Sequence, residues 1–424
     1  MSSSGSTGQF RRPHEQSSRV LKAAPPSRRL GDRRLWFVGI GGAGLSGYAV
    51  LAKAWGAEVA GWDRVETPYL EHVRATGIPV TIEAEPAAAP DSFEAVVSTA
   101  FAGRVPGRTR AELLAELVSL QDSIVVAGAH GKTTTAAMIA FVLDRLGQDP
   151  AFLIGGDVPQ LGGNARAGSG WLVVEGDESD RTIEHLRPKI AVVTNVDLDH
   201  HSEFASRAEV EELFERWLVE VPEVVRGDEL EPADMELAIP GEHNRRNAAV
   251  ALAALELVGV PAEEARAALA DFRGTGRRLE RRGEAGGVTV LDDYAHHPAE
   301  VAATIAAARE EASGGRVLVL FQPHLFSRTR HLARELAMAL AAADAVAVAD
   351  VYPAREEPID GVTGKLVVDA LVEARPGMPV AWAPHVEDGA RFLRGRARAG
   401  DIVVTVGAGD VDRVIPDLLE ALGR

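Results

Sequence analysis

The sequence of 424 residues contains no cysteine. This absence excludes disulfide bonds, thiolate metal sites and cysteine nucleophiles, and it agrees with a reducing compartment. Long apolar runs are also missing: none approaches the roughly 20 residues of a membrane-spanning helix, so we expect no membrane insertion. Basic residues are outnumbered, with 45 Lys and Arg against 62 Asp and Glu and a net charge of -17. Such a surface repels a phosphate backbone, so we expect no nucleic-acid partner.

The composition is that of a globular protein of several domains. Hydrophobic residues make up 46% and charged residues 25% of the chain, which is typical of globular proteins. Since one domain usually has roughly 100–200 residues, we expect three domains. Residues 1–30 are rich in Ser, Gly, Pro and Arg and have no apolar centre. They fit neither a signal peptide nor a helix, so we expect a disordered tail and a cytoplasmic protein.

One stretch combines a strand, a glycine-rich turn and a helix. The apolar residues 124–127 end at Gly128, and Lys132 and Thr133 stand at the start of a helix-like run. The N–H groups of such a turn and of the helix N-terminus bind a polyphosphate, with the lysine at the terminal phosphates and the threonine hydroxyl on Mg²⁺. The pattern departs from the full P-loop, because Val126 stands where that motif has glycine. The alternative is a glycine turn with only a structural role.

A second strand, glycine turn and helix lies nearer the N-terminus. The strand-like residues 34–40 run into the sequence GIGGAGLSG at residues 39–47. The next expected strand ends on Asp63, about twenty residues after the turn, where a dinucleotide-binding unit has an acid that binds a ribose. We therefore expect a nucleotide or dinucleotide here, with a structural turn as the alternative. Ser98 and Thr99 lie near the end of a later expected strand of this sheet (residues 94–100) and would point into the ligand crevice.

Acidic residues follow two apolar strands downstream of the phosphate loop. The strand WLVVE ends in Glu175 and the sequence GDESD, and the strand at residues 190–194 leads into NVDLDHH, which contains His200. Carboxylates at the carboxyl ends of parallel strands, next to a phosphate loop, are typical Mg²⁺ ligands. An isolated acidic cluster is more often a solvated loop, but two clusters in this position indicate a metal site.

Polar residues also gather at element ends in the last part of the chain. Asn244 and Asn247 lie three apart on one face of an expected helix, where they would bind a ligand or cap the helix. Further on, the sequence YAHHP at residues 294–298 follows one strand, and His324 and Arg328 follow the next. Because these side chains all fall at strand ends, we expect them to share one pocket.

Ten motifs, in this order, resemble those of the Mur ligases, the ATP-dependent amino-acid ligases of bacterial cell-wall synthesis. The resemblance runs from about residue 33 to the C-terminus. The motifs are GIGGAGLSG (39–47), AHGKTTT (129–135), VVEGDESD (173–180), TNVDLDH (194–200), GEHNRRNA (241–248), GRRLE (276–280), DDYAHHP (292–298), FQPHLFSRTR (321–330), DVYPAREEP (350–358) and GAGD (407–410). Three of these motifs point to the branch that adds L-alanine. They are GIGGAGLSG, DDYAHHP, and FQPH together with the SRT that follows it.

The resemblance implies an α/β fold of three domains. Residues 31–120 would form a Rossmann-like domain that binds the UDP-sugar. Residues 121–272 would form a central P-loop ATPase domain with a mostly parallel sheet. Residues 273–424 would form a Rossmann-like domain that brings the amino acid and closes over ATP, with hinges near Gln121 and Phe272.

The resemblance also implies, position by position, a site shared by these domains. UDP-N-acetylmuramate would bind at Gly39, Gly41, Gly42, Ala43, Gly44, Asp63 and Ser98. ATP would bind at Gly128, Ala129, His130, Gly131, Lys132, Thr133, Thr134, Asn244, Asn247 and Arg278. Mg²⁺ would bind at Thr133, Glu175 and His200, as two ions, with Mn²⁺ as an alternative metal. L-alanine and the muramoyl carboxylate would meet at Tyr294, His296, His324 and Arg328.

The implied reaction forms an amide through an acyl phosphate, in an enzyme that is a monomer or a homodimer. Lys132 and Arg278 would neutralise the charge that develops on the phosphates. The amine of L-alanine must lose a proton before it attacks, and His200 or His296 would take this proton. The sequence leaves the choice between the two histidines open.

Two departures from the family pattern and two alternatives remain. The stretch between Trp217 and Pro240 is shorter than the corresponding part of the relatives, which leaves the edge of the central sheet undefined. The residues 201–203 differ from those that usually follow His200. A related ligase that adds a peptide or another amino acid is one alternative activity. A nucleotide-binding regulator that has lost ligation is the other.

Overall fold

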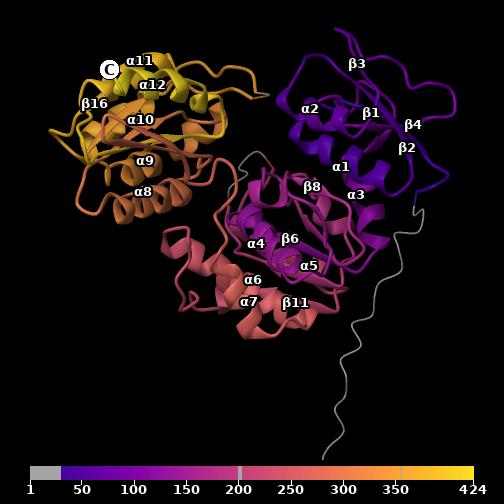
Figure 1. Ribbon diagram of the computed structural model, residues 1–424. Coiled ribbons are helices and arrows are strands. Elements are labelled where there is room, and N and C mark those ends of the chain that lie inside the picture. The colour runs from indigo at the N-terminus through magenta and orange to yellow at the C-terminus, as the bar shows by residue number, and fades with distance from the viewer. Residues whose placement is uncertain (1–29, 199–202, 355) are drawn as a thin grey trace, which may run out of the picture.

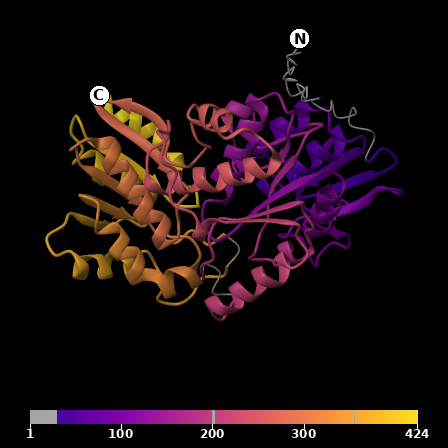
Figure 2. The ribbon, with the colours of Figure 1, turned by 90° about the horizontal axis from the view of Figure 1, so that it is seen from below.

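The computed structural model describes residues 30–198, 203–354 and 356–424 (Figure 1). Helices and strands alternate around three separate sheets of five, six and six strands. Figure 2 shows the indigo N-terminal domain and the orange to yellow C-terminal domain on opposite sides of the molecule, with magenta central segments between them. The predicted α/β fold of three domains is confirmed. The domain boundaries at residues 31, 121 and 273 stay predictions, and the expected tail lies almost entirely outside the described residues.

The N-terminal domain has a parallel sheet in the order β3-β2-β1-β4-β5. Its strands are β1 (Arg34–Val38), β2 (Glu58–Asp63), β3 (Val80–Ile82), β4 (Glu94–Val97) and β5 (Arg108–Thr109). Its helices are α1 (Ala43–Ala54), α2 (Pro68–Ala75) and α3 (Arg110–Ser119). The chain order reverses at β1, and in open parallel sheets ligands bind in the crevice at such a reversal. The glycine turn that follows β1 lies at this crevice.

The central domain has a sheet in the order β11-β10-β6-β9-β7-β8, in which only β7 and β8 pair antiparallel among the described strands. The strands are β6 (Ser123–Ala127), β7 (Ala151–Leu153), β8 (Ala165–Arg166), β9 (Leu172–Glu175), β10 (Ile190–Val193) and β11 (Glu223–Arg226). The α-helices are α4 (Lys132–Arg145), α5 (Arg207–Leu218), α6 (Glu242–Val258) and α7 (Ala262–Leu269). The short segment at residues 218–240 thus supplies β11, which forms the edge that the sequence left undefined.

The C-terminal domain has a sheet in the order β12-β13-β17-β14-β15-β16. Its strands are β12 (Glu280–Ala285), β13 (Val288–Asp293), β14 (Val317–Phe321), β15 (Ala345–Val348), β16 (Val380–Trp382) and β17 (Ile402–Val406). Its α-helices are α8 (Pro298–Ala312), α9 (Phe326–Leu340), α10 (Lys365–Ala374), α11 (Val386–Arg394) and α12 (Ile415–Leu422). We did not predict β12, an antiparallel edge strand of the sequence ERRGEA. A charged edge strand has no apolar run to identify it.

The apolar cores show how the domains are joined. One cluster of buried side chains continues from the N-terminal sheet into one face of the central sheet, whereas the C-terminal sheet has separate clusters on its two faces. Helix α1 packs so closely on the central domain that a Cβ at Gly47 would lie 2.9 Å from Cβ of Ala165. Phe272 is fully buried, and its ring centroid lies 5.5 Å from that of Phe141 in α4. The central core therefore includes Phe272, so a hinge in this region has to follow that residue.

In the described part of the chain, no helix combines the length and the apolar character that crossing a membrane requires.

Candidate active site

The phosphate loop lies between β6 and α4 and needs glycine at two positions. Gly128 has φ 132° and Gly131 has φ 82°, which side chains rarely adopt. An added Cβ would lie 2.3 Å from Oγ1 of Thr194 at the first position and 2.3 Å from Oδ1 of Asn247 at the second. Val126 is buried inside β6, so the strand continues past the point where the full P-loop has its first glycine. The loop therefore begins at Gly128, and α4 directs its N-terminus at it.

Lys132 is held in this loop by buried negative charge. Its Nζ donates to the carbonyl oxygen of Gly128 at 2.5 Å and to Oε1 and Oε2 of Glu178 at 3.1 and 3.2 Å. Burial by itself lowers the pKa of Lys132, but the carboxylates of Glu178 and Asp177 outweigh it and raise this pKa above its ordinary value. The amine is therefore a fixed positive charge beside the helix N-terminus, as phosphate binding requires.

Thr133 and Glu175 bring two oxygen ligands together at the carboxyl end of β9. Oγ1 of Thr133 donates to Oε2 of Glu175 at 3.1 Å, and the N–H of Gly155 donates to Oε1 at 2.5 Å. Burial raises the pKa of the Glu175 carboxyl, although this N–H and Lys132 oppose the shift. A hydroxyl and a partly compensated buried carboxylate fit Mg²⁺, which prefers oxygen ligands and usually shares them with phosphate and water.

His200, the third predicted metal ligand, lies outside the described residues. Within the described ranges, no group of three or more His, Asp or Glu side chains is arranged to hold a metal ion. The metal site therefore stays a prediction, with Thr133 and Glu175 as the two proposed ligands whose geometry is described.

The two predicted asparagines have different surroundings. Asn244 is buried, and its Nδ2 donates to the carbonyl oxygen of Pro240 at 2.6 Å, so this amide helps to fix the start of α6. Asn247 is also buried and faces Gly131 of the phosphate loop. Only Asn247 is thus directed at the nucleotide region, and the role of both residues in ATP binding stays a prediction.

The N-terminal glycine turn is fixed by Asp63. Oδ2 of Asp63 accepts the N–H of Gly41 at 2.7 Å, and Oδ1 accepts that of Arg64 at 2.7 Å. Gly42, Ser98 and Asp63 line a cavity of about 440 Å³ next to this turn. Gly39 and Gly44 lie in the same lining, so five of the seven predicted UDP-sugar residues surround one cavity. Of the other two residues, Gly41 donates its N–H to Asp63 within the turn. The structure does not describe the side chain of Ala43.

Arg110 joins this cavity to the central domain, and the sequence analysis missed it. Its Nη2 lies 3.0 Å from Oδ2 of Asp180 and 3.4 Å from Oδ2 of Asp177. A Cβ at Gly44 would lie 3.7 Å from Cδ of Arg110, so the guanidinium faces the glycine turn. A signal was present: Arg110 is the first residue of α3, after the capping box of Thr109, where the helix dipole disfavours a cation.

A second, larger cavity of about 860 Å³ lies where the three domains meet. Its lining includes Lys132, Thr133 and Glu175 of the central domain, Arg278, Tyr294, His296 and Glu300 of the C-terminal part, and Gly44, Tyr69 and His72 of the N-terminal domain. Residues predicted for phosphate binding, metal binding and the acceptor site therefore share one space. Tyr69 and His72 were not predicted, because they face this space only through the packing of the domains.

The four residues predicted for the acceptor pocket form a continuous row. Nδ1 of His296 lies 2.9 Å from the carbonyl oxygen of Tyr294, and their rings meet edge to face at 5.6 Å. The ring of His296 also lies 5.6 Å from that of His324, whose Nδ1 is 3.2 Å from Nη1 of Arg328. Arg328 is 3% exposed. The four residues are therefore neighbours, as expected, but only Tyr294 and His296 are among the residues that line the larger cavity. Their sharing of one pocket and their roles stay predictions.

Arg277 and Arg278 connect the linker to the C-terminal domain in different ways. Arg277 has φ 55°, and its guanidinium binds Asp292 and the carbonyl oxygens of Gly407 and Gly409. Both guanidinium groups lie close to the ring of Tyr294, at 5.2 and 5.3 Å from its centroid. Both arginines line the shared cavity, and Arg277 also anchors the linker.

Three family models match the chain. "Mur ligase family, catalytic domain" matches residues 34–121, "Mur ligase middle domain" matches residues 126–223, and "Mur ligase, glutamate ligase domain" matches residues 277–409. These three models together define the class, ATP-dependent amino-acid ligases. The chain belongs to the Mur ligase family, as its motifs predicted.

Individual relatives agree with this assignment. UDP-N-acetylmuramate–L-alanine ligase of Streptomyces coelicolor is 40% identical over 451 residues, with 92% of this chain and 97% of the relative covered. The protein of the same name from Rubrobacter xylanophilus is 38% identical over 446 residues, with 92% of this chain and 100% of the relative covered. The crystal structure of UDP-N-acetylmuramate-alanine ligase from Thermotoga maritima superposes with a TM-score of 0.76 at 26% identity, covering 91% of this chain and 98% of that one.

Proposed function

We propose that this chain is an ATP-dependent ligase that joins L-alanine to the carboxylate of UDP-N-acetylmuramate and releases ADP and phosphate. The observation that carries the proposal is the single cavity that Lys132, Arg278 and His296 line together. Phosphate chemistry and amine chemistry can then occur on one substrate carboxylate without its release. The relatives that are about 40% identical along most of the chain carry the name of this activity.

The first step activates the carboxylate, because a carboxylate is a poor electrophile. The muramoyl carboxylate oxygen attacks the γ-phosphate of ATP, which gives an acyl phosphate and ADP. Lys132 and Arg278 stabilise the charge on the transferring group, and the N–H groups of the phosphate loop orient it. Thr133 and Glu175 would hold Mg²⁺, which would supply further neutralisation of the phosphate charge.

The second step forms the amide. The neutral amine of L-alanine attacks the acyl carbon and displaces phosphate. Nδ1 of His296 lies 2.9 Å from the carbonyl oxygen of Tyr294, which in the neutral ring assigns the hydrogen to Nδ1 and leaves the lone pair on Nε2 to accept a proton. His200, the other candidate base, lies outside the described residues, so both histidines stay in the proposal. Arg328 is suited to hold a substrate carboxylate through two parallel hydrogen bonds.

The test is phosphate release from ATP by the purified protein in the presence of UDP-N-acetylmuramate and each amino acid in turn. We expect L-alanine to give the largest kcat/KM, and no release without UDP-N-acetylmuramate. Turnover with a tripeptide but not with L-alanine would instead make the chain a peptide-adding ligase. No turnover with any acceptor, at undiminished ATP binding, would favour a regulator. Lys132→Met is the control for contaminating ATPase activity.

Two further parts of the proposal concern the metal and the setting. Activity should disappear with EDTA and return with Mg²⁺, and titration of the ion against the initial rate distinguishes one required ion from two; Mn²⁺ should replace Mg²⁺ at least in part. We place the reaction in the cytoplasm, where ATP is available. The enzyme is proposed to be a monomer or a homodimer, which light scattering in solution distinguishes.

A further inference from the structure

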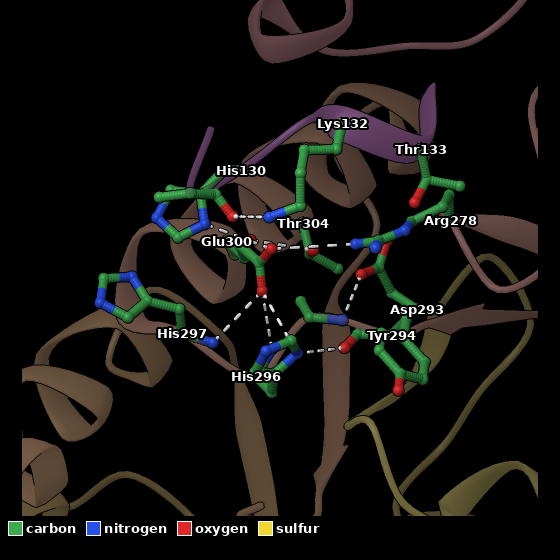
Figure 3. Close-up of polar contacts among 12 residues, drawn as sticks. His130, Lys132, Thr133, Arg278, Asp293, Tyr294, His296, His297, Glu300 and Thr304 are labelled. Atoms are coloured by element: carbon green, nitrogen blue, oxygen red, sulfur yellow. Dashed lines mark hydrogen bonds and ion pairs between the residues drawn. The ribbon is translucent and has the colours of Figure 1, made fainter. Parts of the chain in front are cut away.

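Glu300 places one largely buried carboxylate among three basic side chains (Figure 3). Its Oε1 lies 3.3 Å from Nδ1 of His130 and 3.8 Å from Nη1 of Arg278. Its Oε2 lies 3.5 Å from Nδ1 of His296. The side chain is 12% exposed. Neither the motifs nor the proposed chemistry assigns a role to this residue.

The three basic partners come from different parts of the molecule. His130 belongs to the phosphate loop of the central domain, Arg278 to the linker between the domains, and His296 to the acceptor row. The ring of His130 also lies 4.7 Å from that of His297, the residue before α8. Glu300 thus lies at the point where the C-terminal domain meets the phosphate loop, and Figure 3 shows its carboxylate between the two.

Helix α8 holds this carboxylate in place. Glu300 is the third residue of α8, and its Oε2 accepts the N–H groups of His296 at 3.1 Å and His297 at 3.3 Å. Burial by itself raises the pKa of Glu300, but the charges of His296, His130 and Arg278 outweigh it and hold this pKa well below its ordinary value. The group is therefore an anion with a fixed position beside the Arg278 guanidinium and the imidazole rings of His130 and His296.

A capping role alone does not account for this arrangement. At the third position of a helix, glutamine accepts a backbone N–H about as well as glutamate does. Capping therefore requires an oxygen acceptor but no charge, whereas His130 and Arg278 are held by the charge. Replacing the carboxylate by an amide separates the two roles, because the shape and the N–H acceptor are retained.

We propose that Glu300 is a positioning residue, the shared counter-ion through which the C-terminal domain docks on the phosphate loop and through which Arg278 and His296 are aligned with it. The contacts of Glu300 stabilise the closed arrangement of the domains. In that arrangement the acceptor row lies next to the phosphate loop. The kinetic part of the inference rests on the proposed ligase function; the docking part is measured without turnover.

The test compares Glu300→Gln with the parent enzyme. Small-angle X-ray scattering with UDP-N-acetylmuramate and a non-hydrolysable ATP analogue should show compaction of the parent and at most half of that change in the variant. The kcat with L-alanine should fall at least about tenfold, which corresponds to 1.4 kcal/mol. The Kd of ATP alone should stay within about threefold, because Glu300 is assigned to docking of the C-terminal domain and not to contact with ATP. Glu300→Asp should recover part of the loss, since it retains the charge.

Glu311→Gln is the matched control. Glu311 lies on the same helix, and its Oε1 is 3.2 Å from Nη1 of Arg281 at the surface. This substitution removes an ion pair of the same chemical kind, so its scattering and kcat should equal those of the parent. A general effect of charge on α8 would change both variants alike.

Two results would overturn the inference while the proposed function stands. The first is an active parent with L-alanine and a Glu300→Gln variant of unchanged kcat. The second is equal compaction of the variant and the parent. A parent without ligase activity overturns the proposed function instead, and the scattering comparison still tests docking. If Glu300→Gln does not fold, His130→Gln removes the partner on the other side of the interface and has to reduce compaction in the same way.

Discussion

Nζ of Lys132 lies 3.1 Å from Oε1 of Glu178, so the lysine of the phosphate loop has a counter-ion within the protein. The two residues follow the neighbouring strands β6 and β9. Glu178 is 3% exposed. A phosphate group that approaches Lys132 has to replace or join this carboxylate, which favours ligands with several negative charges over weakly charged ones.

Lys132→Met should abolish ADP formation without unfolding the protein. The amine supplies the positive charge of the loop, and loss of such a transition-state contact costs roughly 3 kcal/mol or more, at least about a hundredfold in rate. The measurement is ADP release with both other substrates present, together with circular dichroism as the folding control. Near-parental turnover would show that the loop is not the phosphate site.

Gly42→Val or Gly44→Val should weaken binding of the nucleotide sugar at least about tenfold and leave ATP affinity within about threefold. An added Cβ would lie 3.4 Å from the carbonyl oxygen of Gly39 or 3.7 Å from Cδ of Arg110, so the fold tolerates it and the side chain enters the cavity. Calorimetry with each ligand alone measures the effect. Gly395→Ala, after α11 and away from the cavity, should change neither affinity. Equal loss of both affinities contradicts the assignment of the two nucleotides to different domains.

Arg328→Ala should raise the KM for L-alanine or UDP-N-acetylmuramate strongly and leave ATP binding nearly intact. Arg328 is buried in the acceptor row beside His324, and alanine cannot replace its paired hydrogen bonds to a carboxylate. Asn247→Ala should impair ATP binding first, because Asn247 faces Gly131 of the phosphate loop. Both variants are measured against all three substrates. If Arg328→Ala lost only ATP affinity, the acceptor pocket would be a nucleotide site.

Asp293→Asn should alter the pH dependence of thermal unfolding of the C-terminal domain. Burial raises the pKa of Asp293 from 3.8 to about 6, against the charge of Arg278 and the N–H groups of Ala295 and Leu279. The folded state therefore binds this proton more tightly than the unfolded state, and the parent loses about 3 kcal/mol of stability as pH rises from about 4 to above 6. Asparagine does not titrate.

Calorimetry of the two proteins from pH 4 to pH 7 measures this difference. The Tm of Asp293→Asn relative to the parent should rise with pH over that interval. The difference in Tm between the two proteins also contains a constant cost, because the amide of asparagine forms weaker hydrogen bonds than the carboxyl group at this position. Only the change of this difference with pH therefore tests the prediction. A difference that stays constant means that the pKa of Asp293 is close to its ordinary value.

The sequence by itself determined the three α/β units and most of the strand ends that carry polar residues. β6 and α4 follow from local pattern, because an apolar run, a glycine turn and a helix that starts at Lys132 need no distant partner to be recognised. The acceptor row followed from a topological rule as well: His296 and His324 come directly after β13 and β14, which β17 separates, and all three strands point the same way. Their side chains were therefore expected at one edge of the sheet.

Only the tertiary structure decided which residues act across the domain interfaces. Arg110 stands at an unfavourable position for a cation, and only the packing of the domains shows that Asp177 and Asp180 of another domain lie beside it. Glu300 was not singled out in the sequence, and only the packing of the domains brings His130 of the phosphate loop to its carboxylate. Propensity and periodicity describe a residue by its sequence neighbours, whereas the charge, burial and partners of these residues depend on chain segments that come together only when the domains pack.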